Sequence, residues 1–434
     1  MPRPSRLTPA VAALLLSAAR ALAQIPAAPA PLQGTTPAEC LQGARDARTR
    51  MVMEARGSGA AVDLAKIAAD ARRLAAACAA PFDVARTEPR QLADLASLYL
   101  FIGDTTGAER ATERSLTVPG LTPRQRGEAY VAAIRTYVAA ADPFAGRVTR
   151  AEDLARSVDA FPDSLADLKL AAHLELVEQY EYADVDDGLR EHAAAILDVA
   201  AHRQRSGAPL PAAVAQRAVL QAYLSLARAA ADLLQPESAL AVLGRGDSAL
   251  ASTPDARTAF ASSRALYALV GTRAAPIAAE HWVNAADTPA TVPVGRGRVT
   301  LLQFTAHWCK PCRNSYPAFK RIAARFAGPA FQALMVTDLY GVFEGRHVTP
   351  AEELAADRTY YGEHWAIPFP VAIALPPAGG GTPQTDEAYH VSGYPQDVVV
   401  DKRGIIRQIV SGWDRGNEER LGRLIEQLER EPAT

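Results

Sequence analysis

The feature that most constrains this chain is a pair of cysteines lying between a strand-like run and a helical one. The apolar run Val299 to Phe304 leads into Trp308-Cys309-Lys310-Pro311-Cys312, and a helical pattern begins at the motif. Two intervening residues place both sulfurs within one helical turn, where they can reach each other. The first thiol then lies at the positive end of the helix dipole, which lowers its pKa and favours the thiolate that attacks disulfides. The pattern predicts Cys309 as the nucleophile and Cys312 as the resolving thiol.

Two other uses of such a pair are less favoured. A zinc site would need further ligands, and neither a second Cys-x-x-Cys nor a histidine at ligand spacing accompanies the motif. An inert structural bridge is also disfavoured, because bridges that close such short loops are uncommon. Lys310 adds a positive charge that favours the Cys309 thiolate further. No bound metal or other cofactor is therefore expected, because the dithiol itself carries the electrons.

The residues around the pair resemble the thioredoxin family, and within it the TlpA/ResA-like periplasmic oxidoreductases. Pro317, eight residues after Cys309, matches the proline of the active-site helix. Gly393-Tyr394-Pro395 matches the loop whose cis proline faces the cysteines and holds the substrate backbone in that family. Gly404 matches the turn between the last two strands of that family, and Gly412 matches a glycine after the final strand. The resemblance extends over residues 276–431, and Pro311 is shared with thioredoxin-like reductases.

One position departs from the family. Thioredoxin buries an aspartate six residues before the first cysteine, where this chain has Gln303, and a neutral amide cannot accept the resolving thiol's proton. Proton transfer then falls to water or to another carboxylate. The resemblance implies a glutamate on an inserted helix, here Glu352 or Glu353, and Asp338 after a strand is a further candidate. Each of the three is more simply interpreted as a solvated or capping residue.

Three side chains beside the motif have expected places. Trp308 is expected to pack as a platform beside the sulfur, serving stability and docking. His307 is expected on the surface, an interpretation favoured over tuning of the thiolate. Tyr394 stands where thioredoxin has a small aliphatic residue, and it is expected to alter both the reduction potential and the choice of substrate.

The chain as a whole is too long for one ordinary domain. Compact cores rarely grow past about 250 residues, and this chain has 434. Up to residue 272 the pattern is helix, turn, helix; after residue 275, strand-like and helical runs alternate, which is typical of an α/β domain. The predicted strands are Val299 to Phe304, Phe331 to Val336, Pro370 to Ala374, Asp397 to Asp401 and Ile405 to Val410. The fold class is thus multidomain: an all-α helical-repeat domain over 36–272 and an α/β thioredoxin-fold domain over 276–434.

The helical part resembles tetratricopeptide repeats in one place. Ala96, Tyr99, Gly103-Asp104 and Ala108 stand where such a unit has its small, aromatic, turn and small residues. The other helices fit that pattern loosely or not at all. An α-solenoid is therefore predicted, and an irregular helical bundle stays open as the alternative.

The first residues are typical of an export signal. Arg3 and Arg6 supply the positive region, Val11 to Ala19 the apolar core, and Ala21-Leu22-Ala23 a cleavage site before Gln24. This interpretation makes residues 1–23 a signal peptide and 24–35 a Pro- and Ala-rich linker, and it places the mature protein in the periplasm or outside the cell. An alanine-rich first helix is the alternative.

The remaining two cysteines lie in a predicted helical hairpin. A capping box from Thr36 to Glu39 opens a helix that runs to about Arg56, and a second helix runs from about Ala60 to Ala80. Two antiparallel helices of equal length bring the start of one beside the end of the other, so Cys40 and Cys78 can meet. A structural disulfide is predicted, in preference to two buried free thiols.

Together these features predict an exported thiol–disulfide oxidoreductase that reduces protein disulfides and is recharged by a membrane thiol donor, as the resemblance implies. Alternatives are a DsbA-like oxidase or isomerase, and a helical-repeat scaffold that binds proteins or peptides and is regulated by its redox domain. The net charge of −2 gives no general attraction to nucleic acid, and no later segment is long and apolar enough to span a membrane.

Overall fold

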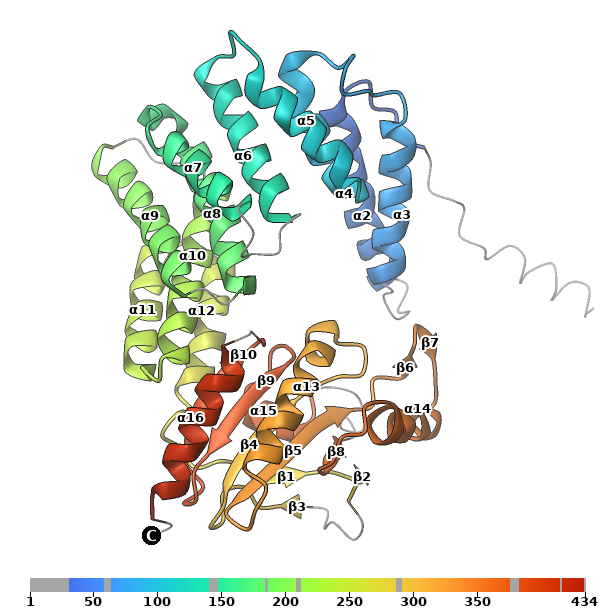
Figure 1. Ribbon diagram of the computed structural model, residues 1–434, viewed down its shortest axis with the longest axis vertical. Helices are drawn as coiled ribbons and strands as arrows, with labels where there is room; N and C mark the ends of the chain where they lie inside the picture. The colour runs from blue at the N-terminus through green and yellow to red at the C-terminus, as the bar shows by residue number, and fades with distance from the viewer. Residues whose placement is uncertain are drawn as a thin grey trace, which may run out of the picture. The chain divides into compact units, whose positions relative to one another are not determined.

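The computed structural model describes residues 31–57, 64–139, 147–183, 186–207, 212–285, 291–374, 382–413 and 416–432. The predicted signal peptide, residues 1–23, and most of the predicted linker lie outside these ranges. The chain divides after Arg114 into two compact units, which are described separately. The change from helices to a sheet falls inside the second unit (Figure 1).

The first unit is helical. Its helices are α2 (Pro37–Gly57), α3 (Leu64–Ala79), α4 (Leu92–Ile102) and most of α5 (Thr105–Thr117), with a short 3-10 turn over Pro89–Gln91. The predicted capping box opens α2, since Thr36 N–H donates to Glu39 and Glu39 N–H donates to the Thr36 hydroxyl. Gly103 ends α4 with a φ of 86°, a left-handed conformation that glycine adopts without steric cost.

A disulfide joins the first two helices of this unit. Cys40 near the start of α2 and Cys78 near the end of α3 are bonded, with their Cα atoms 5.7 Å apart. Both cysteines are buried in a small core with Leu41, Ala75 and Leu98. The hairpin register predicted from the sequence is therefore confirmed. The described part of the second helix begins at Leu64, and its predicted first residues lie outside the described ranges.

The second unit begins with a layer of helices. They are α6 (Pro123–Ala139), α7 (Arg147–Asp159), α8 (Ala166–Ala183), α9 (Asp186–Arg205), α10 (Ala212–Asp232), α11 (Pro236–Ala249) and α12 (Pro254–Tyr267), with a 3-10 turn over Asp163–Leu165. Helices adjacent in sequence pack on each other, and many of the buried side chains are alanines, which let helix axes approach closely. A capping box opens α6: Thr122 N–H and its hydroxyl donate to the side-chain oxygen of Gln125, and Gln125 N–H donates to the Thr122 hydroxyl.

A six-stranded sheet follows, in the order β10-β9-β4-β5-β8-β2. Its strands are β2 (His281–Val283), β4 (Val299–Phe304), β5 (Phe331–Asp338), β8 (Val371–Ala374), β9 (Gln396–Val400) and β10 (Ile406–Ser411). Strands β4, β5 and β8 run parallel, and β2, β9 and β10 pair antiparallel to their neighbours. The predicted α/β region is confirmed, with the strand before the cysteine motif at the centre of the sheet.

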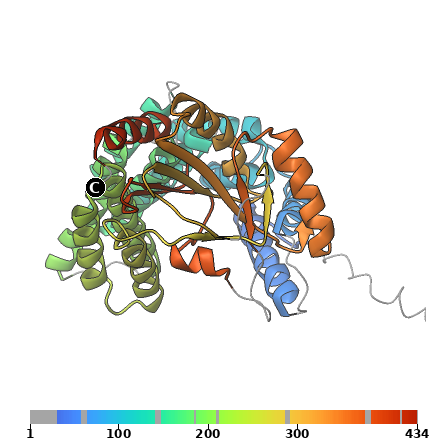
Figure 2. The same ribbon diagram turned by 90° about the horizontal axis from the view of Figure 1, so that it is seen from below.

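Helices and short hairpins complete this region. They are β1 (Ile277–Ala278) with β3 (Thr291–Val292), β6 (Val342–Phe343) with β7 (Arg346–His347), α13 (Lys310–Arg325), α14 (Pro350–Asp357), a π-helical turn η3 (Arg358–His364), α15 (Gln384–Ala388) and α16 (Asn417–Arg430). Figure 2 shows α13 and α16 on one face of the sheet and α15 on the other. No helix in the described ranges is long and apolar enough to cross a bilayer.

The second face of the sheet shares its core with the helical layer. Leu302 and Phe304 of β4 belong to the same buried cluster as Leu266 and Tyr267 of α12. The amide of Gln408 in β10 also donates a 2.8 Å hydrogen bond to the Ala231 carbonyl at the end of α10. Because that cluster is continuous, the helical layer and the sheet of the second unit are packed as one body.

Candidate active site

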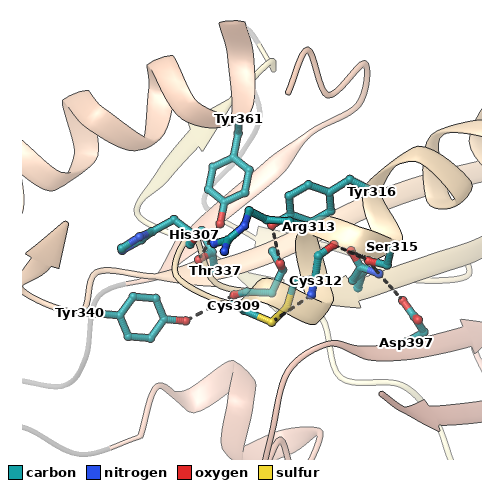
Figure 3. Close-up of a disulfide and its surroundings, with 12 residues drawn as sticks. His307, Cys309, Cys312, Arg313, Ser315, Tyr316, Thr337, Tyr340, Tyr361 and Asp397 are labelled. Carbon is teal, nitrogen blue, oxygen red and sulfur yellow. Dashed lines mark hydrogen bonds between the residues drawn. A yellow bond between two sulfur atoms is a disulfide. The ribbon is translucent and has the colours of Figure 1, made fainter. Parts of the chain in front are cut away.

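The two motif cysteines lie where the central strand passes into α13, and they are bonded to each other. Cys309 is the N-cap of that helix, and its sulfur accepts a 3.1 Å hydrogen bond from the Cys312 N–H (Figure 3). No acidic side chain stands in the first turn, and Lys310 is exposed there. The helix dipole and Lys310 therefore act on the Cys309 sulfur without an opposing charge on the same turn.

The two sulfurs differ slightly in burial. Cys309 is 4% exposed and Cys312 is fully buried, so Cys309 is the more accessible of the two to a client disulfide. Trp308, directly before the pair, is 53% exposed. Its ring lies edge-on to the ring of Tyr394, with centroids 5.8 Å apart. This half-exposed indole forms an aromatic surface beside the motif, as a docking platform requires.

The loop that precedes β9 contains a cis peptide bond between Tyr394 and Pro395, at the position that the resemblance implied. The Pro395 carbonyl accepts a 2.8 Å hydrogen bond from Gly412 N–H, just after β10. Gly412 has a φ of 87°, so a residue with a side chain would be strained there. The Trp308–Tyr394 contact brings this loop to the cysteine motif.

Behind the cysteines lies a buried acid that sequence analysis missed. Gln303 of β4 stands opposite Asp397 of β9 in the strand register, and its amide donates a 2.9 Å hydrogen bond to Asp397 Oδ1. The same amide lies 3.2 Å from the Ser315 hydroxyl, which donates to the Cys312 carbonyl at 2.7 Å. Figure 3 shows Ser315 and Asp397 on the same side of Cys312, joined by these hydrogen bonds.

Burial controls the charge of this acid. Asp397 is fully buried, which raises its pKa to about 8, although the hydrogen bond from Gln303 acts in the opposite direction. The one sequence signal was an aspartate next to the apolar run Val398 to Val400. Its partner could not be identified, because the register between β4 and β9 is set by the folded sheet. The pair thus supplies a titratable group where residue 303 alone supplies none.

The three acids considered from the sequence have different surroundings. Glu352 is exposed and caps α14 with Thr349, as predicted. The prediction that Glu353 is solvated or capping is wrong, because Glu353 is fully buried. It accepts hydrogen bonds from Tyr340 N–H at 2.9 Å and Gly341 N–H at 2.7 Å. Glu353 thus ties α14 to the loop after β5.

The expected surface position of His307 is also wrong. His307 is 5% exposed, and its Nε2 lies 3.2 Å from Glu353 Oε1. Phe343 of β6 packs on its ring with centroids 4.6 Å apart. The backbone carbonyl of His307 accepts hydrogen bonds from Arg313 and from the Tyr360 hydroxyl, each at 3.0 Å. The segment between β5 and η3 folds over His307 and holds the backbone that precedes Trp308.

Asp338 at the end of β5 is likewise buried, which corrects its expected solvation. The Tyr394 hydroxyl lies 3.4 Å from Asp338 Oδ2 and donates to Asp386 Oδ2 at 3.0 Å. Burial, and then the nearby charge of Asp386, raise the pKa of Asp338. These two acids lie beside Tyr394 and Trp308, whereas Asp397 lies beneath Cys312.

Comparison with known proteins gives this geometry a context. The chain is 26% identical over 117 residues to the thioredoxin-like protein YneN of Bacillus subtilis, covering 27% of this chain and 58% of the relative. It is 24% identical over 117 residues to the thiol-disulfide oxidoreductase ResA of Geobacillus kaustophilus, covering 27% of this chain and 56% of that protein. Its relatives are thioredoxin-like thiol–disulfide oxidoreductases. The chain covers little more than half the length of these curated relatives.

Solved structures give matches of the same kind. A thioredoxin-like superfamily protein is 26% identical with a TM-score of 0.32, covering 37% of this chain and 99% of that one. A thiol-disulfide isomerase from Corynebacterium glutamicum is 26% identical with a TM-score of 0.31, covering 37% of this chain and 98% of that one. No model of a known protein family matches the sequence.

The thioredoxin-like region thus combines three chemical elements. It has a bonded cysteine pair at a helix N-terminus, a half-exposed aromatic surface beside that pair, and a buried carboxyl group linked by hydrogen bonds to the turn that holds Cys312. A dithiol in this setting can form and break disulfides, while the carboxyl group titrates in the range where thiols do.

Proposed function

We propose that this chain is an exported thiol–disulfide oxidoreductase that reduces disulfides of periplasmic proteins. The observation that carries the proposal is the Cys309–Cys312 pair at the N-terminus of α13, with the Gln303–Asp397 pair behind it. The similarity to proteins named as thiol-disulfide oxidoreductases supports it. The redox-active disulfide is itself the electron carrier, and the proposal includes no bound cofactor.

The exchange proceeds in two steps. In the reduced protein, the Cys309 thiolate attacks one sulfur of a client disulfide, and the other client sulfur leaves as a thiolate that takes up a proton. The Cys312 thiol then loses its proton and attacks the Cys309 sulfur. That step releases the second client thiol and leaves a Cys309–Cys312 disulfide. The client gains two electrons and two protons. The protein gives up two electrons and the Cys312 proton, and the second proton comes from solvent because Cys309 attacks as a thiolate.

Asp397 supports the second step. Since Gln303 cannot accept a proton, we assign to the buried carboxyl of Asp397 the role of accepting the Cys312 proton. The hydrogen bonds of Gln303 and Ser315 hold this carboxyl group behind the turn that contains Cys312. Raised by burial to about 8, the pKa of Asp397 lies near that of an ordinary thiol, so the two groups can exchange a proton at little cost. Glu353 is less suited, because two backbone N–H groups and His307 already surround its oxygens.

Trapping of a mixed disulfide tests the proposal. We expect Cys309→Ser to abolish reduction of a protein disulfide such as that of insulin, and Cys312→Ser to accumulate a mixed disulfide through Cys309. The matched control is the double change Cys40→Ala and Cys78→Ala, which removes the other disulfide and should leave exchange intact. An unreactive Cys309 beside a reactive Cys312 would reverse the assignment, and exchange that survives both serine changes would refute it.

Export and electron supply belong to the same proposal. Cleavage near Ala23 would release a mature chain that begins at Gln24, and a membrane thiol donor would return electrons to Cys309–Cys312. N-terminal sequencing of the protein from a periplasmic fraction tests the first point: a chain that still starts at Met1 in the cytoplasm would contradict export.

The helices before residue 272 have a proposed role as well. We propose that they form tetratricopeptide-like repeats that bind a protein or peptide partner. Within each unit, helices that follow one another in sequence pack together, as α2 does with α3 and α8 with α9, which supports this assignment. Crosslinking that finds partner contacts only on the α/β region would count against it.

A further inference from the structure

A cavity of about 540 Å³ lies beside the cysteine motif and has no role in the exchange steps above. Its wall includes Trp308, Asp338, Tyr340, Asp386, Gly393 and Tyr394. Trp308 directly precedes Cys309, and Tyr394 directly precedes the cis proline. A group in this cavity is therefore next to the place where a client chain would present its disulfide.

Two buried carboxyl groups line the cavity. Asp338 is 5% exposed and Asp386 is 3% exposed, and they come from separate elements, the end of β5 and α15. The Tyr394 hydroxyl lies beside one oxygen of each, and the two carboxyl groups also lie close enough to interact with each other. Oδ1 of each accepts no hydrogen bond from a donor among the described residues. Buried carboxyl oxygens without partners are rare in native proteins, and a missing ligand is one explanation for them.

Three aromatic rings complete the wall. The ring of Trp308 is edge-on to those of Tyr340 and Tyr394, with centroids 5.4 Å and 5.8 Å apart, and the two tyrosine rings are 6.4 Å apart. Aromatic faces attract cations through the ring quadrupole. Rings and carboxyl groups therefore favour the same kind of ligand, a positively charged group that donates hydrogen bonds.

We propose that this cavity binds the basic side chain, lysine or arginine, of a client segment close to the cysteine that Cys309 attacks. The inference rests on the proposed exchange activity and adds a substrate class to it. An ammonium group brings three N–H donors and a guanidinium five, enough for both unpaired Oδ1 atoms. An apolar side chain would leave those oxygens unpaired, and an acidic one would be repelled by them.

Matched peptides test the preference. Each peptide carries one cysteine as a mixed disulfide with thionitrobenzoate, and one neighbouring position, scanned along the peptide, holds arginine, norleucine or glutamate. With the full-length reduced protein, we expect kcat/KM at the best position to be about tenfold higher for arginine than for norleucine, and lowest for glutamate. The double variant Asp338→Asn and Asp386→Asn should bring the arginine-to-norleucine ratio close to one.

A charge-matched control separates the cavity from the general field of the protein. Glu387 is exposed and follows Asp386 directly, so Glu387→Gln removes a negative charge nearby without altering the wall. This control should keep the arginine preference. A preference that falls equally in the control would overturn the proposal, as would one that survives in the double variant, once circular dichroism has shown that each variant is folded.

Direct binding keeps the inference independent of the activity. Titration calorimetry of the oxidised protein with cysteine-free arginine peptides should show saturable binding, weakened at least tenfold in the double variant and unchanged in the control. If Cys309 exchanged with no peptide at all, the proposed function would fail, while this titration would still decide the cavity. Equal or absent binding of arginine and norleucine peptides would refute the cavity proposal alone.

Discussion

At the scale of single residues, the relocation of the buried acid is the main departure from the thioredoxin pattern. Gln303 and Asp397 face each other across neighbouring strands, so an acid on either strand occupies nearly the same buried place beneath Cys312. In the sequence alone, Gln303 stands where thioredoxin has its buried aspartate, which implies that the buried carboxyl group is lost. The register of the sheet restores it from a residue 94 positions further along the chain.

Replacing Asp397 should affect both stability and kinetics. The pKa of Asp397 is raised from 3.8 to about 8, so between these values the native chain holds a proton that the unfolded chain has lost. Stability contributed by this group therefore falls as pH rises through that window. We expect Asp397→Asn to be more stable than the wild type at pH 8, by about 3 kcal/mol in denaturant unfolding. We also expect the rate at which this variant resolves a mixed disulfide to show no titration near pH 8.

The exchanged pair is the control for that experiment. Gln303→Asp combined with Asp397→Asn keeps one acid and one amide in the same place with their positions reversed. The titration should return in this double variant. A wild-type pH–rate profile in Asp397→Asn would show that water or another group takes the proton.

At the scale of elements, a buried polar chain joins three helices of the second unit. His173 of α8 and His192 of α9 share a hydrogen bond of 2.9 Å between their Nδ1 atoms, which requires one of these nitrogens to carry a proton and the other to lack one. Their Nε2 atoms bond Asp159 at 2.9 Å and Glu152 at 3.0 Å, both on α7. This network fixes α7 against α8 and α9 by directional hydrogen bonds. The small alanine side chains of this layer provide few interlocking contacts that would fix the helices by packing alone.

Glu152 is the member whose charge can be tested. Burial acts to raise its pKa, but hydrogen bonds from His192 and Tyr180 outweigh burial and lower it below the usual 4.5. Its stabilisation is present above that value and is lost as pH falls through the lowered pKa. We expect Glu152→Gln to cost about 1–2 kcal/mol at pH 7 and little near pH 3, measured by urea unfolding.

A neighbouring acid provides the control. Asp153 is 66% exposed and pairs with Arg156 at the surface, so Asp153→Asn should change stability by under about 0.5 kcal/mol. Equal losses in the two variants would mean that the network adds nothing beyond surface charge.

Sequence patterns predicted the elements much better than the contacts between them. The strand Val299–Phe304 was predicted to the residue, because apolar β-forming residues and the motif mark its ends. His307 and Asp338 were misplaced for a different reason: polar side chains are normally exposed. The segment between β5 and β8 buries His307, whereas Asp386 of α15 and Tyr394 lie against Asp338. Asp397 was overlooked because the sequence of one strand does not show which residues of the neighbouring strand it will pair with.

At the scale of the whole molecule, the second unit joins its helical layer to the sheet through one core. Leu266, Tyr267 and the sheet residues Leu302 and Phe304 are buried together, and Gln408 bonds the end of α10. Removing the helices would expose that apolar face to water, at roughly 25 cal/mol for each Å².

Truncation tests this dependence. A fragment from Ser115 to the end should unfold cooperatively and keep disulfide exchange, whereas a fragment from Thr272 should melt at least about 10 °C lower and bind a hydrophobic dye. Equal melting temperatures for the two fragments, with no dye binding, would show that the α/β region is an independent domain.

The most direct test of the proposed function is the reduction potential of the Cys309–Cys312 pair, measured on the intact chain by equilibration with dithiothreitol buffers and alkylation of the free thiols. We expect a reversible two-electron transition with a reduction potential of about −270 mV, as for a reductant of the thioredoxin type. A value near about −120 mV would contradict the reducing direction. A pair that stays oxidised until the chain unfolds would contradict disulfide exchange itself.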